Sequence, residues 1–174
     1  MKKLIALLLA AMMVLSLGAC GAKKEEAKTP LTDPLEKIVE NIYAVTAPQF
    51  GPVSTPVDIN DTEWSLYSFT GLTSNEGIKE AMASESMIGS IPYSLVLVRV
   101  EEGADTKAIA EQMKAGIDQR KWVCVEADDL LVSGYCDLIM LVMVGSEFAA
   151  DGITAQAMTD AFQQVCGAEL DFTI

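Results

Sequence analysis

The sequence contains no histidine among its 174 residues. Histidine is the side chain whose unperturbed charge changes near neutral pH, and it is the commonest metal ligand in proteins. Its absence excludes the Ser-His-Asp triad, the Cys-His pair and every histidine-ligated zinc site. We therefore expect no metal centre, no cofactor and no catalytic residue of these kinds in the chain.

Cysteine is scarce as well. Cys124, Cys136 and Cys166 follow Cys20, and none of them forms a C-x-x-C motif, so a thioredoxin-like redox site is absent. Cys124 lies between two valines, a context typical of a small buried hydrophobic residue. One disulfide among the three, or redox chemistry, are the alternatives to burial. An odd number leaves at least one thiol free unless it pairs with a second molecule.

Basic residues are few. From residue 33 onward there are seven Lys and Arg and 23 Asp and Glu, a net charge of −16. Phosphate backbones and anionic headgroups repel such a domain, so nucleic acid is excluded as a partner. Acidity of this kind keeps a domain soluble, and it also suits cations or basic partners.

No apolar run at the N-terminus is long enough to span a bilayer comfortably. The uncharged run at residues 4–17 has 14 residues and follows Lys2 and Lys3. A spanning helix needs roughly 20 apolar residues. A short apolar run behind a basic start is typical of a secretory signal peptide.

The residues Leu17-Gly18-Ala19-Cys20 end this run, and they resemble the bacterial lipoprotein box. The resemblance implies that the signal is cut between Ala19 and Cys20 and that the Cys20 thiol receives a diacylglyceryl group. Two acyl chains hold a protein firmly on a membrane, whereas one binds marginally. We predict lipid attachment at Cys20, on the extracytoplasmic face of the cell membrane. An ordinary signal peptide and a retained membrane helix are the alternatives.

This interpretation divides the chain into three parts. Residues 1–19 are the lipoprotein signal peptide, and residues 20–32 are the lipidated cysteine and a flexible tether of small and charged residues. Residues 33–174 form one extracytoplasmic domain, long enough to bury a sizeable core.

Hydrophobic periodicity and turn residues predict an α+β domain. The expected order is α-β-α-β-α-β-β-α, with about four strands in a mixed or antiparallel sheet packed with amphipathic helices. Helices are expected over Asp33–Val45, from 74 to about 82, from Asp105, and from Asp151 or Thr154 to a stop at Gly167. Strands are expected at 63–69, 93–100, 122–125 with 130–132, and 137–144.

Two of these strands, 93–100 and 137–144, are apolar on both faces. A strand of this kind is central in its sheet and covered on both sides. The segment 47–61 contains three prolines and is predicted to be a long extended loop.

Residues 58–63, at the end of this loop, place Asp58, Asn60, Asp61 and Glu63 close together. Calcium prefers such oxygen ligands, but an EF-hand needs glycine at the sixth position, where this loop has Glu63. A solvated acidic loop is the expected outcome, and a cation site is the alternative. Adjacent acidic residues at 101–102 and 128–129 would face opposite ways in a strand, which is poor geometry for a catalytic pair.

Other side chains have structural interpretations. Met140 and Met143 have apolar neighbours and are expected in the core rather than on copper. Trp64 and Trp122 are expected to be buried anchors at strand starts, with a sugar platform as the alternative. Arg99 is the one charge in its strand and is expected to reach out at the strand end or to pair with a carboxylate such as that of Glu101.

Residues 85–144 resemble the uncharacterised bacterial lipoproteins called domain-of-unknown-function 4358. The resemblance is carried by the strand "YSLVLVRV" at 93–100, by the helix and exit "GAD…K…GIDQRKW" at 103–122, and by "V.ADDL" at 125–130. It implies a lipoprotein domain, and it carries no catalytic residue.

The function expected from these observations is a non-enzymatic, lipid-anchored binding or scaffold module that contacts an envelope protein or a small ligand. The alternatives are an envelope hydrolase that uses Asp or Glu carboxylates and a transporter-associated solute receptor. A deep cleft with converging carboxylates would favour the enzyme. An exposed apolar patch would favour the binding module.

Overall fold

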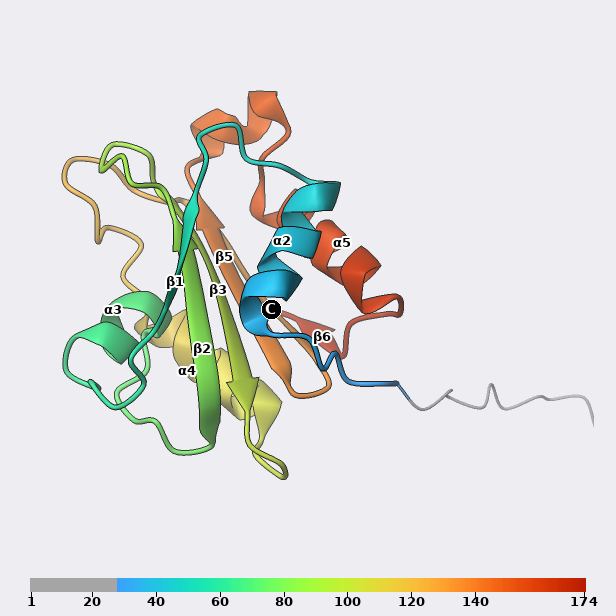
Figure 1. Ribbon diagram of the computed structural model, residues 1–174. Helices are drawn as coiled ribbons and strands as arrows, with labels where there is room; N and C mark the ends of the chain where they lie inside the picture. The colour runs from blue at the N-terminus through green and yellow to red at the C-terminus, as the bar shows by residue number, and fades with distance from the viewer. Residues whose placement is uncertain (1–27) are drawn as a thin grey trace, which may run out of the picture.

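The computed structural model describes residues 28–174 (Figure 1). The predicted signal peptide, Cys20 and the first part of the predicted tether lie outside these residues. The elements are α2 (Leu35–Val45), β1 (Val53–Pro56), α3 (Ser65–Thr70), β2 (Ile78–Glu85), β3 (Tyr93–Val100), α4 (Thr106–Gly116), β4 (Asp129–Tyr135), β5 (Leu138–Val144), the 3-10 helix η1 (Ser146–Asp151), α5 (Ala155–Cys166) and β6 (Phe172–Thr173). None of the helices described over 28–174 has the length and apolarity needed to cross a membrane.

The strands form one sheet of six in the order β1-β2-β3-β5-β4-β6, and every neighbouring pair is antiparallel. The α+β class is confirmed, but the predicted number of about four strands is too low. The edge strands β1 and β6 have four and two residues. Segments so short carry too little alternation to be recognised in a sequence.

The sheet is covered on both faces (Figure 1). Helices α2 and α5 pack on one face, and α3 and α4 pack on the other. All residues of β3 and β5 are buried. The prediction that these two strands are central and covered on both sides is confirmed, because alternate side chains enter two separate cores.

The prediction of a strand at residues 63–69 is wrong, because most of these residues belong to α3. The Asp61 side chain accepts a hydrogen bond from the Trp64 backbone N–H at 3.0 Å, which shapes the turn into the helix. Gly71, with a φ of 76°, ends it. A helix of six residues is too short for its 3.6-residue period to appear against the strand preference of its aromatic residues.

The helix predicted near 74–82 is a strand, β2, which begins at Ile78. Its Ala, Met, Glu and Lys residues favour a helix locally. Pairing with β1 on one side and β3 on the other overrides that preference. The strand predicted at 122–125 is also wrong, because these residues lie in the loop between α4 and β4.

Of the three predicted helices that form, two begin at the predicted residue. Asp105 accepts a hydrogen bond from the Ala108 N–H at 3.0 Å and begins α4. Thr154 does the same for α5, which ends at Gly167 with a φ of 69°. The helix expected to begin at Asp33 begins at Leu35 instead, because Pro34 occupies the cap position and no side chain caps that helix.

Candidate functional site

The predicted acidic loop at 58–63 uses its carboxylates to shape the backbone. Asp58 Oδ1 accepts a hydrogen bond from the Asn60 N–H at 3.0 Å, and Asp61 bonds the Trp64 N–H as described above. Within residues 28–174, no three or more acidic and cysteine side chains are grouped so that they could hold a metal ion.

Asp128 and Asp129 serve two different partners at the start of β4. Asp128 accepts hydrogen bonds from the Ser146 hydroxyl at 2.8 Å and from its N–H at 2.7 Å, and these bonds lower the pKa of Asp128. Asp129 accepts one from the Ala155 N–H at 2.7 Å, at the first turn of α5. The two side chains therefore fasten η1 and α5 to the sheet and do not converge on a common site.

The structure separates the predicted core residues into two groups. Met140 and Met143 are fully buried, as predicted. Trp64, predicted as a buried anchor, is 76% exposed at the cap position of α3. Trp122 is half-buried in the loop between α4 and β4. Neither tryptophan stands at the start of a strand. The aromatic residue type alone did not reveal which side of its element would face water.

Arg99 is buried, with 8% of its surface exposed. Its Nη1 contacts Glu80 Oε1 at 2.6 Å, on the neighbouring strand β2. The expected pairing with a carboxylate is therefore confirmed, but the partner is Glu80 and not Glu101. Its Nη2 donates hydrogen bonds to the carbonyl oxygens of Leu31 at 3.0 Å and Asp33 at 2.8 Å. Arg99 thus binds the segment through which the chain enters the domain.

Two more contacts hold that segment at the same end of the sheet. The Tyr135 hydroxyl donates to the Thr29 carbonyl oxygen at 3.1 Å, and Lys28 Nζ contacts Asp171 Oδ1 at 2.5 Å. Residues 28–33 are therefore fixed beside the end of β4 and the strand β6. Any anchor N-terminal to Lys28 would act on the domain from this end.

Cys124, Cys136 and Cys166 are free thiols in the structure. Cys166 is buried at the end of α5, as expected of a small hydrophobic residue. Cys124 is exposed at a loop tip with a φ of 70°, so its predicted burial is wrong. Burial raises the pKa of the Cys166 thiol to about 12.

The raised pKa of Cys166 predicts that the free energy of unfolding falls at alkaline pH. Its folded pKa lies above the ordinary value of 9.0, so its stabilising contribution is complete below pH 9 and is lost as the pH rises toward 12. Between these two pH values we expect the free energy of unfolding to fall by about 1 kcal/mol per pH unit. This slope is smaller than the ideal value because water screens part of the thiolate charge. Denaturant melts at pH 8 and pH 10.5 should show a larger loss for the wild type than for Cys166→Ala. Parallel losses would contradict the assignment.

The loop between α4 and β4 is closed at its base. The Gln119 carbonyl oxygen accepts a hydrogen bond from the Ala127 N–H at 2.9 Å, and Gln119 Nε2 donates to the Ala127 carbonyl oxygen at 2.6 Å. A loop of this length with joined ends is an Ω-loop, a type that is frequently functional. Its tip projects Val123, which is 82% exposed.

Lys121 ties this loop to the rest of the domain. Its ammonium group contacts Glu85 Oε1 at the end of β2 and donates to the Ser68 carbonyl oxygen of α3 at 3.2 Å. It also lies 5.3 Å from the ring centroids of Phe69 and Trp122. Burial lowers the pKa of Lys121, and the nearby Glu85 carboxylate acts in the opposite direction. One buried cation therefore joins the loop, α3 and the β2–β3 hairpin.

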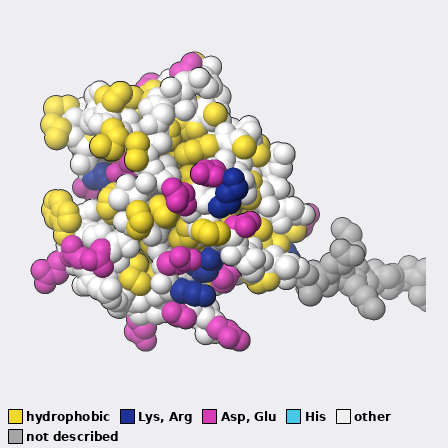
Figure 2. Space-filling view, viewed as in Figure 1, with side chains coloured by type: hydrophobic (Ala, Val, Ile, Leu, Met, Phe, Trp, Pro, Cys, Tyr) yellow, Lys and Arg dark blue, Asp and Glu magenta, His cyan; other side chains and the backbone are white. Residues whose placement is uncertain are grey.

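These three segments carry most of the large exposed hydrophobic side chains. We define the loop face by five of them, which come from α3 and its first turn, the β2–β3 loop and the Ω-loop: Trp64, Tyr67, Met87, Ile88 and Val123. Figure 1 places the two loops side by side at one end of the sheet, and Figure 2 shows hydrophobic side chains along this side of the molecule, with acidic side chains beside them.

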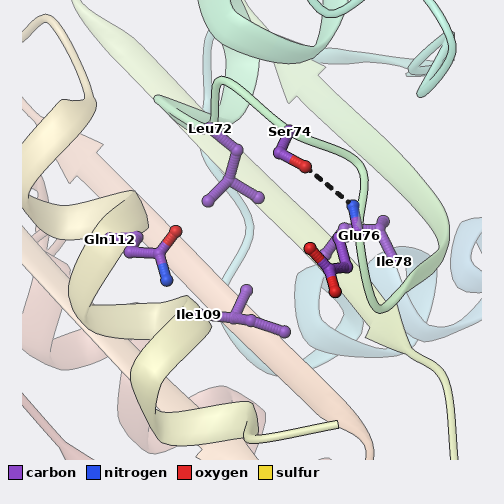
Figure 3. Close-up of a pocket in the computed structure, with 6 residues that line it drawn as sticks. All are labelled: Leu72, Ser74, Glu76, Ile78, Ile109 and Gln112. Carbon is purple, nitrogen blue, oxygen red and sulfur yellow. Dashed lines mark hydrogen bonds between the residues drawn. The ribbon is translucent and has the colours of Figure 1, made fainter.

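The larger hollows described over residues 28–174, of about 310–470 Å³, are open to solvent, and the more enclosed one is small. Figure 3 shows the enclosed one, between α4 and the segment before β2, with a volume of about 170 Å³. Leu72, Ile78 and Ile109 give it apolar walls, and Glu76 is the one carboxylate among its described lining residues. Ligand sites usually measure about 300–1,000 Å³. This hollow therefore lacks both the size and the converging carboxylates that a hydrolase would need.

Comparisons with protein-family models, with curated proteins and with solved structures gave no match to this chain.

Proposed function

We propose that the protein is a lipid-anchored extracytoplasmic lipoprotein whose domain binds another envelope protein and performs no chemistry itself. The observation that supports this proposal is the loop face, where five large hydrophobic side chains remain in water. Exposed apolar side chains that gather on one side of a domain mark interaction sites more often than scattered ones do. The resemblance of residues 85–144 to the 4358 lipoproteins supports the same class.

The position of the chain entry gives the loop face its direction. Residues 28–33 are fixed beside the last residue of β4, Tyr135. The Ω-loop lies at the other end of this strand, just before its first residue, Asp129. The seven residues of β4 separate the two ends by roughly 20 Å. A domain anchored through Cys20 would accordingly turn the tips of the Ω-loop and the β2–β3 loop away from the membrane, toward proteins that lie further out.

Lipid attachment is tested at Cys20, which lies outside the described residues. Cys20→Ser removes the thiol that would accept the diacylglyceryl group, so an unprocessed precursor should accumulate. Mass spectrometry of the protein from its own cells should find a lipidated cysteine as the mature N-terminus in the wild type. An unmodified mature N-terminus would disprove the lipoprotein assignment.

Partner binding is tested by crosslinking in intact cells. A photoreactive residue at position 123, on the loop face, should give a discrete adduct with one protein. The matched control is position 164, which is exposed on α5 on another side of the domain. Equal adducts at both positions, or none at either, would contradict a binding role for the loop face.

A further inference from the structure

The segments that carry the loop face are acidic. Residues 58–70, 85–92 and 117–128 contain seven Asp and Glu and two basic residues, a net charge of −5. Both basic side chains are already paired: Arg120 Nε contacts Glu126 Oε2 at 2.9 Å, and Lys121 contacts Glu85. The charges left without a counter-charge on these segments are therefore negative.

We propose that the loop face binds a cationic amphipathic segment of a neighbouring protein, an inference that rests on the proposed function. The apolar side of such a segment would cover Met87, Ile88 and Val123 at the loop tips. Its Lys and Arg side chains would lie against unpaired acidic residues of these segments, such as the exposed Asp118 at the base of the Ω-loop. Complementary charge of this kind speeds association and selects the partner.

The charge of the domain disfavours the other occupants. Two copies would each bring a net charge of −16 from residue 33 onward, and like charge across an interface is unfavourable. Anionic headgroups are repelled for the same reason. The eight residues from Cys20 to Lys28 extend at most about 28 Å, and they enter the domain at the end of the sheet away from the loop tips.

The surface is held in place before any partner arrives. The Gln119–Ala127 hydrogen bonds close the base of the Ω-loop, and Lys121 joins this loop to β2 and α3. A partner segment would therefore meet side chains on a fixed backbone and lose little free energy in ordering them. This preorganisation separates the loop face from a mobile surface loop that exposes a hydrophobic residue by chance.

The experiment uses intrinsic fluorescence of the full-length lipidated protein in nanodiscs of phosphatidylcholine. The chain has two tryptophans, Trp64 and Trp122, and both lie on the segments of the loop face, so the emission reports on this surface. The probe is a synthetic, tryptophan-free amphipathic helix of leucine and lysine. We expect it to shift the emission to shorter wavelength with saturation, and the affinity to fall as salt rises.

Three controls separate this mode of binding from general attraction. A peptide in which serine replaces leucine keeps the charge and should bind at least about tenfold more weakly, as should a leucine–glutamate peptide. The variant Met87→Ser/Val123→Ser should weaken the leucine–lysine peptide by a similar factor. Val45→Ser removes an exposed hydrophobic side chain at the end of α2 and should leave binding unchanged.

Several outcomes would overturn the proposal. If the serine–lysine peptide binds as tightly as the leucine–lysine peptide, the attraction is nonspecific electrostatics. The same conclusion holds if the leucine–lysine peptide binds Met87→Ser/Val123→Ser as tightly as it binds the wild type. Reversible dimers in sedimentation, lost in the same variant, would assign the face to a second copy. If the crosslink from position 123 appears but the leucine–lysine peptide does not bind, the partner-binding function stands and its cationic partner is wrong.

Discussion

Replacing Leu97 or Leu141 by alanine is expected to lower the free energy of unfolding by about 2–5 kcal/mol in each case. Both side chains are fully buried, on the two central strands β3 and β5. Leu97 enters the core beneath α2 and α5, and Leu141 enters the core beneath α3 and α4. Each truncation removes buried methyl groups and leaves a cavity that a sheet covered on both faces cannot readily fill.

Equilibrium denaturant melts of the purified protein measure both losses. Val123→Ala is the matched control, because it truncates an aliphatic side chain that is exposed at a loop tip, and its effect should stay within about 0.5 kcal/mol. Losses below about 1 kcal/mol for both leucine variants would contradict the placement of these strands in the interior. A loss for only one of them would show that one face of the sheet is less well packed than the other.

Glu85→Ala is expected to lower the free energy of unfolding by about 3 kcal/mol, although Glu85 lies at the end of a strand. The substitution leaves the Lys121 ammonium group without its counter-charge and the Ser94 hydroxyl, which donates to Glu85 at 2.6 Å, without its acceptor. Breaking a fully buried pair costs about 3–5 kcal/mol. The Glu85 and Lys121 side chains keep 23% and 15% of their exposure, so we expect the lower end of that range.

The matched control is the double variant Glu85→Ala/Lys121→Met, which removes both charges and keeps an apolar stem of similar length. It should be more stable than Glu85→Ala alone, since no unpaired cation remains. A double variant as unstable as Glu85→Ala would assign the loss to packing instead of charge. A cost below about 1 kcal/mol for Glu85→Ala would show that the pair is solvated.

The pH dependence of Glu85→Ala follows from Lys121. Burial holds its folded pKa below the ordinary value of 10.5, so the lysine favours folding most above that value and least once the pH has fallen through the folded pKa. Removal of Glu85 lowers the folded pKa further. The deficit of Glu85→Ala relative to wild type should therefore shrink between pH 7 and pH 10, where the unpaired amine can lose its proton.

The sequence by itself determined the centre of the fold and the ends of two helices. Strands 93–100 and 137–144 could be recognised because nearly every position that enters either core is apolar, with Ser94 and Arg99 the exceptions in β3, and no partner is needed to see that pattern. Asp105, Thr154 and Gly167 act through hydrogen bonds or backbone angles within their own turn. The lipoprotein box at Cys20 is likewise local, and it stays a prediction.

Only the tertiary structure decided the rest. Residues 78–85 have the composition of a helix and become strand β2 because β1 and β3 pair with them from both sides. Arg99 pairs with Glu80 and not with Glu101, since a strand brings together residues across its ladder and separates neighbours in sequence. Lys121 and Glu85 are 36 positions apart, and no local pattern links them. The loop face depends on that contact, so it became visible only when long-range pairing had placed three separate segments on one side of the domain.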